Sequence, residues 1–107
     1  IRVYDVNADG SLANGRIFAE NIGDGELASG VVDGMKCDEH GNIYVTGPQG
    51  LWVYNTSGTH LGTIEMPEHS ANLNWGGSDW SDLYICCSTS VYRVRMKVSG
   101  NHLSYMT

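Results

Sequence analysis

The stretch Asn42-Ile43-Tyr44-Val45-Thr46 returns 40 positions later as Asp82-Leu83-Tyr84-Ile85-Cys86. A second pair, Leu51-Trp52-Val53-Tyr54 and Val91-Tyr92-Arg93-Val94, has the same spacing. Repeats of this period that consist of short β-rich runs are typical of β-propeller blades. A blade is a small twisted sheet that buries both faces against its neighbours, so a chain with two blades is expected to belong to a larger ring.

The composition is that of a folded, acidic chain. Of its 107 residues, 41% are hydrophobic and 17% are charged, and 14 glycines suit short strands joined by tight turns. The formal net charge is −6, with only 6 Lys and Arg residues together. Nucleic acids and anionic membranes bind to surfaces rich in Lys and Arg, which this chain has too few basic residues to form. Neither is therefore expected as a partner.

The three cysteines, Cys37, Cys86 and Cys87, form no CxxC pair. An odd number argues against a disulfide framework, and we expect small, buried apolar side chains instead. No apolar run approaches the ~18 residues of a membrane span. The sequence leaves the compartment open, with a cytoplasmic location favoured.

Turn residues predict an all-β fold with a leading hairpin and two blades. Residues 1–20 form the end of one blade and 33–66 a four-stranded blade. Residues 72–107 form the next blade, whose fourth strand lies near Ser104-Tyr105 or is supplied elsewhere. The predicted strands of the two blades are 34–38, 43–46, 51–55, 61–65, 72–75, 83–87 and 91–98. Because the chain begins inside a strand at Ile1, we expect a piece of a propeller. This piece should fold poorly alone, because both blade ends leave apolar faces and strand edges uncovered.

Two polar residues stand where the first strand of each predicted blade begins, at the mouth of the propeller axis. Asp33 lies ten residues before Ile43, and Asn72 lies eleven before Leu83. A carboxylate and a carboxamide that converge on an axis are oxygen donors suited to Ca²⁺, Mg²⁺ or Mn²⁺. The alternative is that both are ordinary turn residues, since Asp-Gly and Asn are common in turns.

At these residues the sequence resembles a known family. The run 33–46, Asp-Gly-Met-Lys-Cys-Asp-Glu-His-Gly-Asn-Ile-Tyr-Val-Thr, is similar to the Asp-Gly-Met to Gly-Asn-apolar-Tyr/Trp-Val stretch of the family of gluconolactonase, senescence marker protein (SMP-30) and luciferin-regenerating enzyme. The resemblance extends over nearly the whole chain and includes residues 1–18, Gly50 to Tyr54, His60 to Ile64, Asn72 to Gly77, Leu83 to Ile85 and Ser90 to Arg93.

This resemblance implies a six-bladed propeller with one divalent ion on its axis and hydrolysis of sugar lactones. Ca²⁺ is the expected ion, with Mg²⁺, Mn²⁺ and Zn²⁺ as alternatives. Asp33 matches the family's Asp, a metal ligand and candidate general base, and Asn72 matches a pocket-lining position expected to bind substrate. The remaining ligands would precede Ile1, on missing upstream blades, so activity is expected only in the intact propeller. Val32 stands where the family usually has Pro.

Two further functions stay open at this point. One is a propeller that binds or scaffolds without catalysis, because a fold does not fix a function. The other is a related metal-dependent esterase or phosphotriesterase. Among the histidines, His69 alone lies in the loop that leads to an axial position, so it is the one catalytic candidate worth testing. A surface role is the simpler interpretation of His69. The three tryptophans, Trp52, Trp75 and Trp80, are expected to pack between blades.

Overall fold

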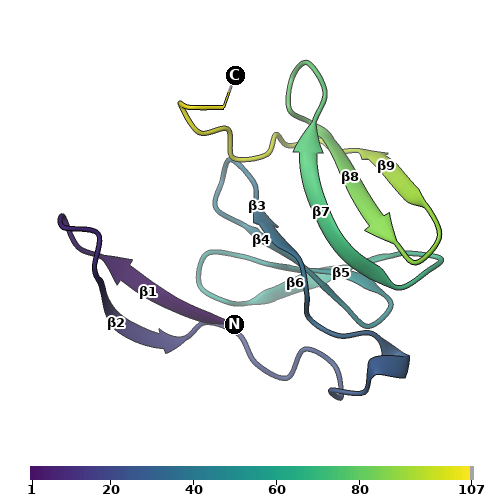
Figure 1. Cartoon of the computed structure of the whole chain (residues 1–107), viewed down its shortest axis with the longest axis horizontal. Helices are drawn as coiled ribbons and strands as arrows, with labels where there is room; N and C mark the ends of the chain where they lie inside the picture. Colours follow the sequence, from purple (N-terminus) through teal and green to yellow (C-terminus); the bar gives the residue numbers. More distant parts are fainter. Residues whose placement is uncertain (107) are drawn as a thin grey trace.

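The computed structural model describes residues 1–106 and contains three antiparallel sheets that follow one another along the chain (Figure 1). The first is a hairpin of β1 (Arg2–Val6) and β2 (Leu12–Ile17). The second has four strands, β3 (Met35–Cys37), β4 (Ile43–Gly47), β5 (Gly50–Tyr54) and β6 (His60–Glu65). The third has three strands, β7 (Ser70–Gly76), β8 (Asp82–Cys87) and β9 (Val91–Arg95). A short 3-10 helix, Leu27–Ser29, lies between the hairpin and β3.

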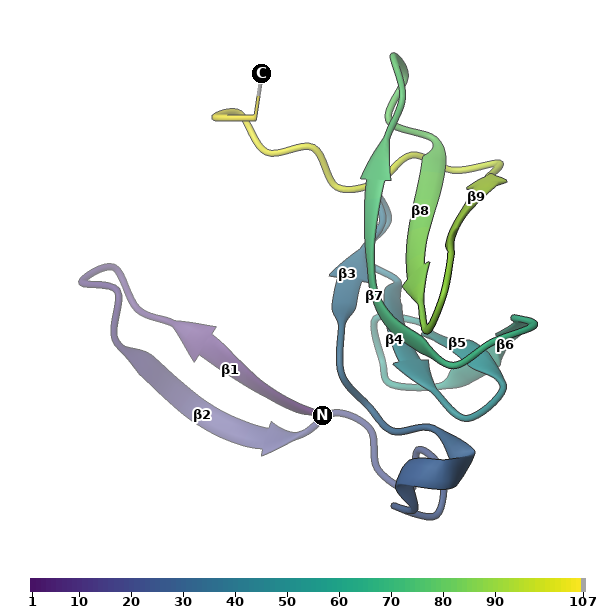
Figure 2. The same cartoon turned by 45° about the vertical axis from the view of Figure 1, so that its right-hand side comes forward.

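Each sheet is a simple meander in which neighbours in sequence are neighbours in space. The turns are short, and Gly41 and Gly58 adopt the positive φ that such reversals need. Strands β3 and β7 are the first strands of their sheets, and β7 contacts both β3 and β4. First strands side by side, with the later strands fanning outward, are the arrangement of propeller blades (Figure 2). No helix in the described residues is long and apolar enough to cross a membrane.

The main core lies between the second and third sheets. Its buried members are Tyr44, Leu51, Leu73, Trp75, Leu83 and Ile85. The ring of Trp75 meets that of Tyr44 edge-on, with centroids 5.4 Å apart and planes at 85°. This geometry favours aromatic pairs beyond the area they bury. The expectation that tryptophan packs between blades is therefore confirmed for Trp75.

The two repeated strands differ in how many faces they bury. In β4, Tyr44 faces the third sheet while Val45 packs with Ala19 and Tyr54 on the hairpin side, so both faces are covered. In β8, burial alternates instead, and Tyr84 is exposed. Only β4 is therefore covered on both faces, because no sheet in the described residues covers the outer face of β8.

Three further expectations are corrected by the structure. The third sheet has three strands in the described residues, and Ser104 and Tyr105 form a turn. Strand β9 ends at Arg95 rather than at residue 98. None of the cysteines is fully buried: Cys86 is exposed, while Cys37 and Cys87 are half-buried and all three are free. Strand alternation explains this, because the last two residues of β8 must face opposite sides.

The segment after β9 crosses back to the second sheet rather than extending its own. Gly100 forms an antiparallel bridge with Asp38, and the Glu39 N–H donates to the Ser99 carbonyl at 2.9 Å. The Asn101 N–H donates to the Cys37 carbonyl at 3.1 Å. Residues 98–101, named here the strap, therefore join the two sheets at the end of β3 that lies away from Asp33.

Candidate functional site

Asp33 directly precedes β3, and its backbone is held by a buried hydroxyl on the neighbouring strand. The N–H groups of Asp33 and Gly34 both donate to Oγ1 of Thr46, at 3.0 and 3.1 Å. Thr46 is fully buried in β4, and its own N–H donates to the Gly34 carbonyl at 3.0 Å. The main chain beneath the Asp33 carboxylate is thus fixed from two directions.

Gly34 allows the first strands of two sheets to approach closely at this point. Its N–H donates to the Ala71 carbonyl at 2.9 Å. A Cβ at this position would lie 2.6 Å from Cα of Asn72 and 2.8 Å from the Ala71 oxygen, so only glycine fits. The two positions predicted from the repeat are therefore brought close together: Asp33 lies just before β3, and Asn72 lies on the adjoining strand β7.

A pocket of about 200 Å³ opens beside Asp33. The loop before β3, the start of β7 and the β8–β9 turn line it, with the residues Leu27, Gly30, Val31, Asp33, His69, Ser70, Ala71, Cys87 and Ser88. Asn72 is not among the lining residues, and its Oδ1 accepts a hydrogen bond from the Leu73 N–H at 2.9 Å. The sequence already indicated His69 as a residue near the axial face. It did not indicate Cys87 and Ser88 as neighbours of Asp33, because they lie at the β8–β9 turn, and Ser88 follows Asp33 by 55 residues in the chain.

The loop that forms one wall of this pocket is ordered by its own polar contacts. The Asp24 carboxylate accepts the Glu26 N–H at 2.9 Å and the Ser29 hydroxyl at 3.1 Å. These hydrogen bonds lower the pKa of Asp24 below its usual value. Gly30 is buried, with a φ of 97° that favours glycine, and lies against the backbone of Gly47 and Pro48. The wall is therefore a defined surface rather than a loose connection.

Comparison with known proteins identifies the family. Residues 1–89 match the family model described as the SMP-30/Gluconolactonase/LRE-like region. The chain belongs to this family. A gluconolactonase of Zymomonas mobilis is 33% identical over 104 residues, and regucalcin of Danio rerio is 34% identical over 93 residues. These alignments cover 94% and 83% of this chain but only 29% of each relative.

Solved structures of the SMP-30/gluconolactonase/LRE-like family share the fold. The X-ray structure of a candidate gluconolactonase superposes with a TM-score of 0.80 at 25% identity, over 95% of this chain and 33% of that one. A luciferin-regenerating enzyme gives 0.76 at 26% identity, over 92% of this chain and 39% of that one. The prediction of an all-β propeller fragment is confirmed, and the chain spans about a third of these relatives.

The carboxylate of Asp33 has the chemistry of a cation ligand. It is exposed, and no protein group in the described part of the chain donates a hydrogen bond or an ion pair to it. A hard divalent ion takes six or more oxygen ligands, however. Among residues 1–106 no three His, Cys, Asp or Glu side chains gather closely enough to hold a metal ion. Asp33 therefore fits such an ion as one ligand, and no cluster of His, Cys, Asp or Glu side chains in residues 1–106 completes a site around it.

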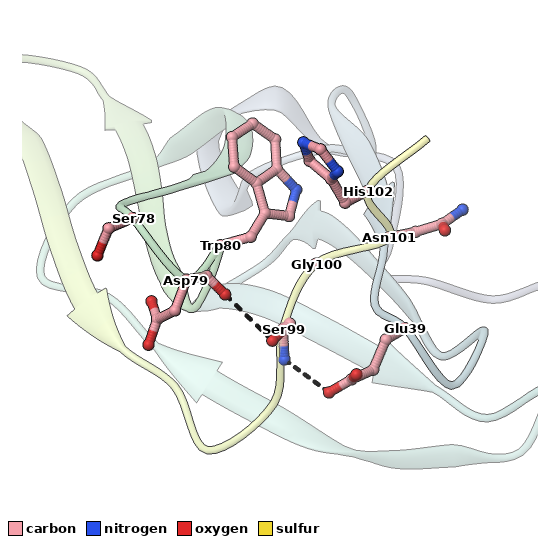
Figure 3. Close-up of a pocket in the computed structure, with 8 residues that line it drawn as sticks. All are labelled: Glu39, Ser78, Asp79, Trp80, Ser99, Gly100, Asn101 and His102. Carbon is pink, nitrogen blue, oxygen red and sulfur yellow. Dashed lines mark hydrogen bonds between the residues drawn. The ribbon is translucent and has the colours of Figure 1, made fainter. Parts of the chain in front are cut away.

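A larger hollow of about 480 Å³ lies at the opposite end of β3, beside the strap (Figure 3). Its two acidic side chains are already engaged. Glu39 accepts the Ser99 N–H at 2.9 Å, and Asp79 forms an ion pair with Arg95, which lowers the pKa of Asp79. The remaining lining residues are Ser78, Trp80, Ser99, Gly100, Asn101 and His102. Because its carboxylates bind the protein itself, this hollow is a weaker candidate for catalysis than the Asp33 pocket.

The other histidines are remote from Asp33 or engaged elsewhere. His40 is exposed in the β3–β4 turn, at the far end of β3. The His60 ring stacks on Trp52 with centroids 4.6 Å apart, and His102 meets Trp80 edge-on at 4.9 Å. Of the four histidines, only His69 lines the pocket that contains Asp33.

Proposed function

We propose that this chain supplies the Asp33 side of the active site of a divalent-metal-dependent lactone hydrolase, of the gluconolactonase type, that is active only as an intact propeller. The observation that carries the proposal is the Asp33 carboxylate, which lies beside a pocket just before β3, on a backbone held by Thr46, and has no hydrogen-bond partner among residues 1–106. Membership of a family with relatives named gluconolactonase and lactonohydrolase supports the reaction class.

In this proposal the two Thr46 hydrogen bonds fix the backbone of Asp33, so that the carboxylate is positioned before substrate arrives. Such preorganisation lowers the cost of reaching the transition state. An Asp33 oxygen would bind the ion, preferably Ca²⁺, or accept the proton of the attacking water. A bound divalent ion supplies Lewis-acid polarisation of the lactone carbonyl. Asn72, on the adjoining strand, would contact substrate from the side of β7.

The test is the replacement of Asp33 by Asn in a complete propeller that contains this chain. The amide keeps the size of the side chain but removes its charge, so hydrolysis of D-glucono-1,5-lactone should fall at least 100-fold. Asp9→Asn is the matched control, because Asp9 is an exposed carboxylate in the β1–β2 turn and should not affect turnover. Normal lactonase activity in Asp33→Asn would refute the assignment.

The same assay separates the two other functions. A phosphotriesterase or esterase would turn over an aryl phosphotriester or aryl ester faster than the lactone, with the same dependence on Asp33. A scaffold would hydrolyse none of these substrates. Lactone hydrolysis that is lost with the Asp33 carboxylate is the result expected here.

A further inference from the structure

His69 and Asp33 share one pocket although 36 residues separate them in the chain. His69 precedes β7, and its carbonyl accepts the Ser88 N–H at 3.1 Å, which ties its main chain to the β8–β9 turn. Its side chain is exposed and has no hydrogen-bond partner among the described residues. The backbone of His69 is therefore held in place, while the donor and the acceptor of its imidazole remain available.

The pocket has an apolar part and a polar part. Leu27, Val31 and Ala71 are apolar lining residues, whereas His69 and Ser88 have side chains that can donate and accept hydrogen bonds. The Ser70 hydroxyl is already 3.4 Å from Sγ of Cys87. A hydroxylated sugar ring has the same two characters, with C–H groups on its faces and hydroxyls at its edge. A volume of about 200 Å³ is suited to a single ring rather than to a longer saccharide.

We propose that His69 is a specificity-determining residue, which hydrogen-bonds a ring hydroxyl of the lactone substrate while Asp33 acts at the carbonyl end. The inference rests on the proposed lactone hydrolysis and deepens it, because it explains how a hydroxylated lactone is preferred over an unsubstituted one. A site that hydrogen-bonds a substrate hydroxyl discriminates against the analogue that lacks it, since the group in the site is then left unpaired.

Two substrates with the same six-membered lactone ring test this role. D-Glucono-1,5-lactone carries the hydroxyls, and δ-valerolactone does not. In a complete propeller, His69→Ala should raise KM for gluconolactone about fivefold, the worth of one net hydrogen bond, and leave kcat within about twofold. KM for valerolactone should stay unchanged. His69→Asn, which keeps an amide donor near the position of Nδ1, should recover part of the preference and guards against a folding defect in the alanine variant.

His40→Ala is the matched control, because His40 is also exposed but lies at the other end of β3. This variant should leave KM and kcat unchanged for both lactones. If His69→Ala raises KM equally for both lactones, or for neither, the specificity role is wrong while lactone hydrolysis stands. If the unsubstituted protein hydrolyses neither lactone, the proposed function itself is overturned, and this inference with it.

Discussion

Replacement of Asp38 by Ala should destabilise the protein more than any other change in a turn. Asp38 follows β3 and is only 1% exposed, an unusual position for a carboxylate. Its Oδ1 accepts the N–H groups of His40 and Asn42, both at 2.9 Å. Its Oδ2 accepts the Asn42 side-chain amide at 2.9 Å and the Tyr44 hydroxyl at 3.2 Å. One side chain thus closes the β3–β4 turn and supports the Tyr44 ring against Trp75.

The size of the effect follows from these four contacts. Hydrogen bonds to a charged group contribute roughly 1.5–3 kcal/mol each, and the contributions do not add fully. Asn42 is partly exposed, so water can replace some of what it loses. Asp38→Ala leaves neutral donors without an acceptor, at a cost of about 1–3 kcal/mol for each one that stays buried, so a total loss of about 3–5 kcal/mol is expected. Asp38→Asn retains one acceptor oxygen and should cost about half as much.

Asp79 provides the comparison, because it occupies the corresponding β7–β8 turn and its Oδ1 likewise accepts the N–H two residues on, that of Ser81, at 3.2 Å. It is exposed and pairs with Arg95 in solvent, where such pairs contribute little. The midpoint of guanidinium unfolding of the complete propeller, followed by tryptophan fluorescence, should be measured for Asp38→Ala, Asp38→Asn and Asp79→Ala. An Asp38→Ala midpoint no lower than that of Asp79→Ala would refute the argument that burial sets the cost.

Two further changes test the contacts around Asp33 and the pH dependence of the core. Gly34→Ala places a methyl group against the backbone of Ala71 and Asn72, so it should destabilise the protein by roughly 2–3 kcal/mol. The backbone amide of residue 34, which donates to the Ala71 carbonyl, should then exchange its hydrogen faster than in the parent protein. Unchanged exchange at residue 34 would mean that β7 and the segment before β3 do not approach as described. Burial, with the nearby Asp38 charge, raises the pKa of Tyr44 to about 12 from a usual value near 10, so its contribution to stability is fully present below pH 10 and is lost as the pH rises through 12. In Tyr44→Phe the free energy of unfolding should therefore fall less steeply between pH 10 and 12 than in the parent protein. The same slope in both proteins would contradict this prediction.

The strand pattern could be predicted because it depends on local sequence. The repeat placed β4 and β8 within a residue or two, since apolar runs bounded by Gly-rich turns define short strands. The same repeat aligned Asp33 with Asn72, and in the structure Asp33 lies just before β3 while Asn72 lies on the adjoining strand β7. Both inferences needed only the spacing between similar segments.

What could not be predicted depends on contacts between distant segments. Asp38 has the sequence of an ordinary exposed turn residue, yet the strap bridges to it through Gly100. Gly100 also lies against the Trp75 ring, where a Cβ would not fit. Likewise, Ser88 and Cys87 reach the Asp33 pocket only because β8 and β9 bring their turn beside His69, at the start of β7. No local pattern indicates which turns will meet.

The most direct measurement is a calorimetric titration of metal-free complete propeller with Ca²⁺, then with Mg²⁺ and Mn²⁺, beside Asp33→Asn and Asp9→Asn. We expect one ion per propeller, with an affinity that is at least ~100-fold lower in Asp33→Asn and unchanged in Asp9→Asn. Equal affinity in the unsubstituted protein and Asp33→Asn would show that this carboxylate does not hold the ion, and the proposed site would have to be abandoned.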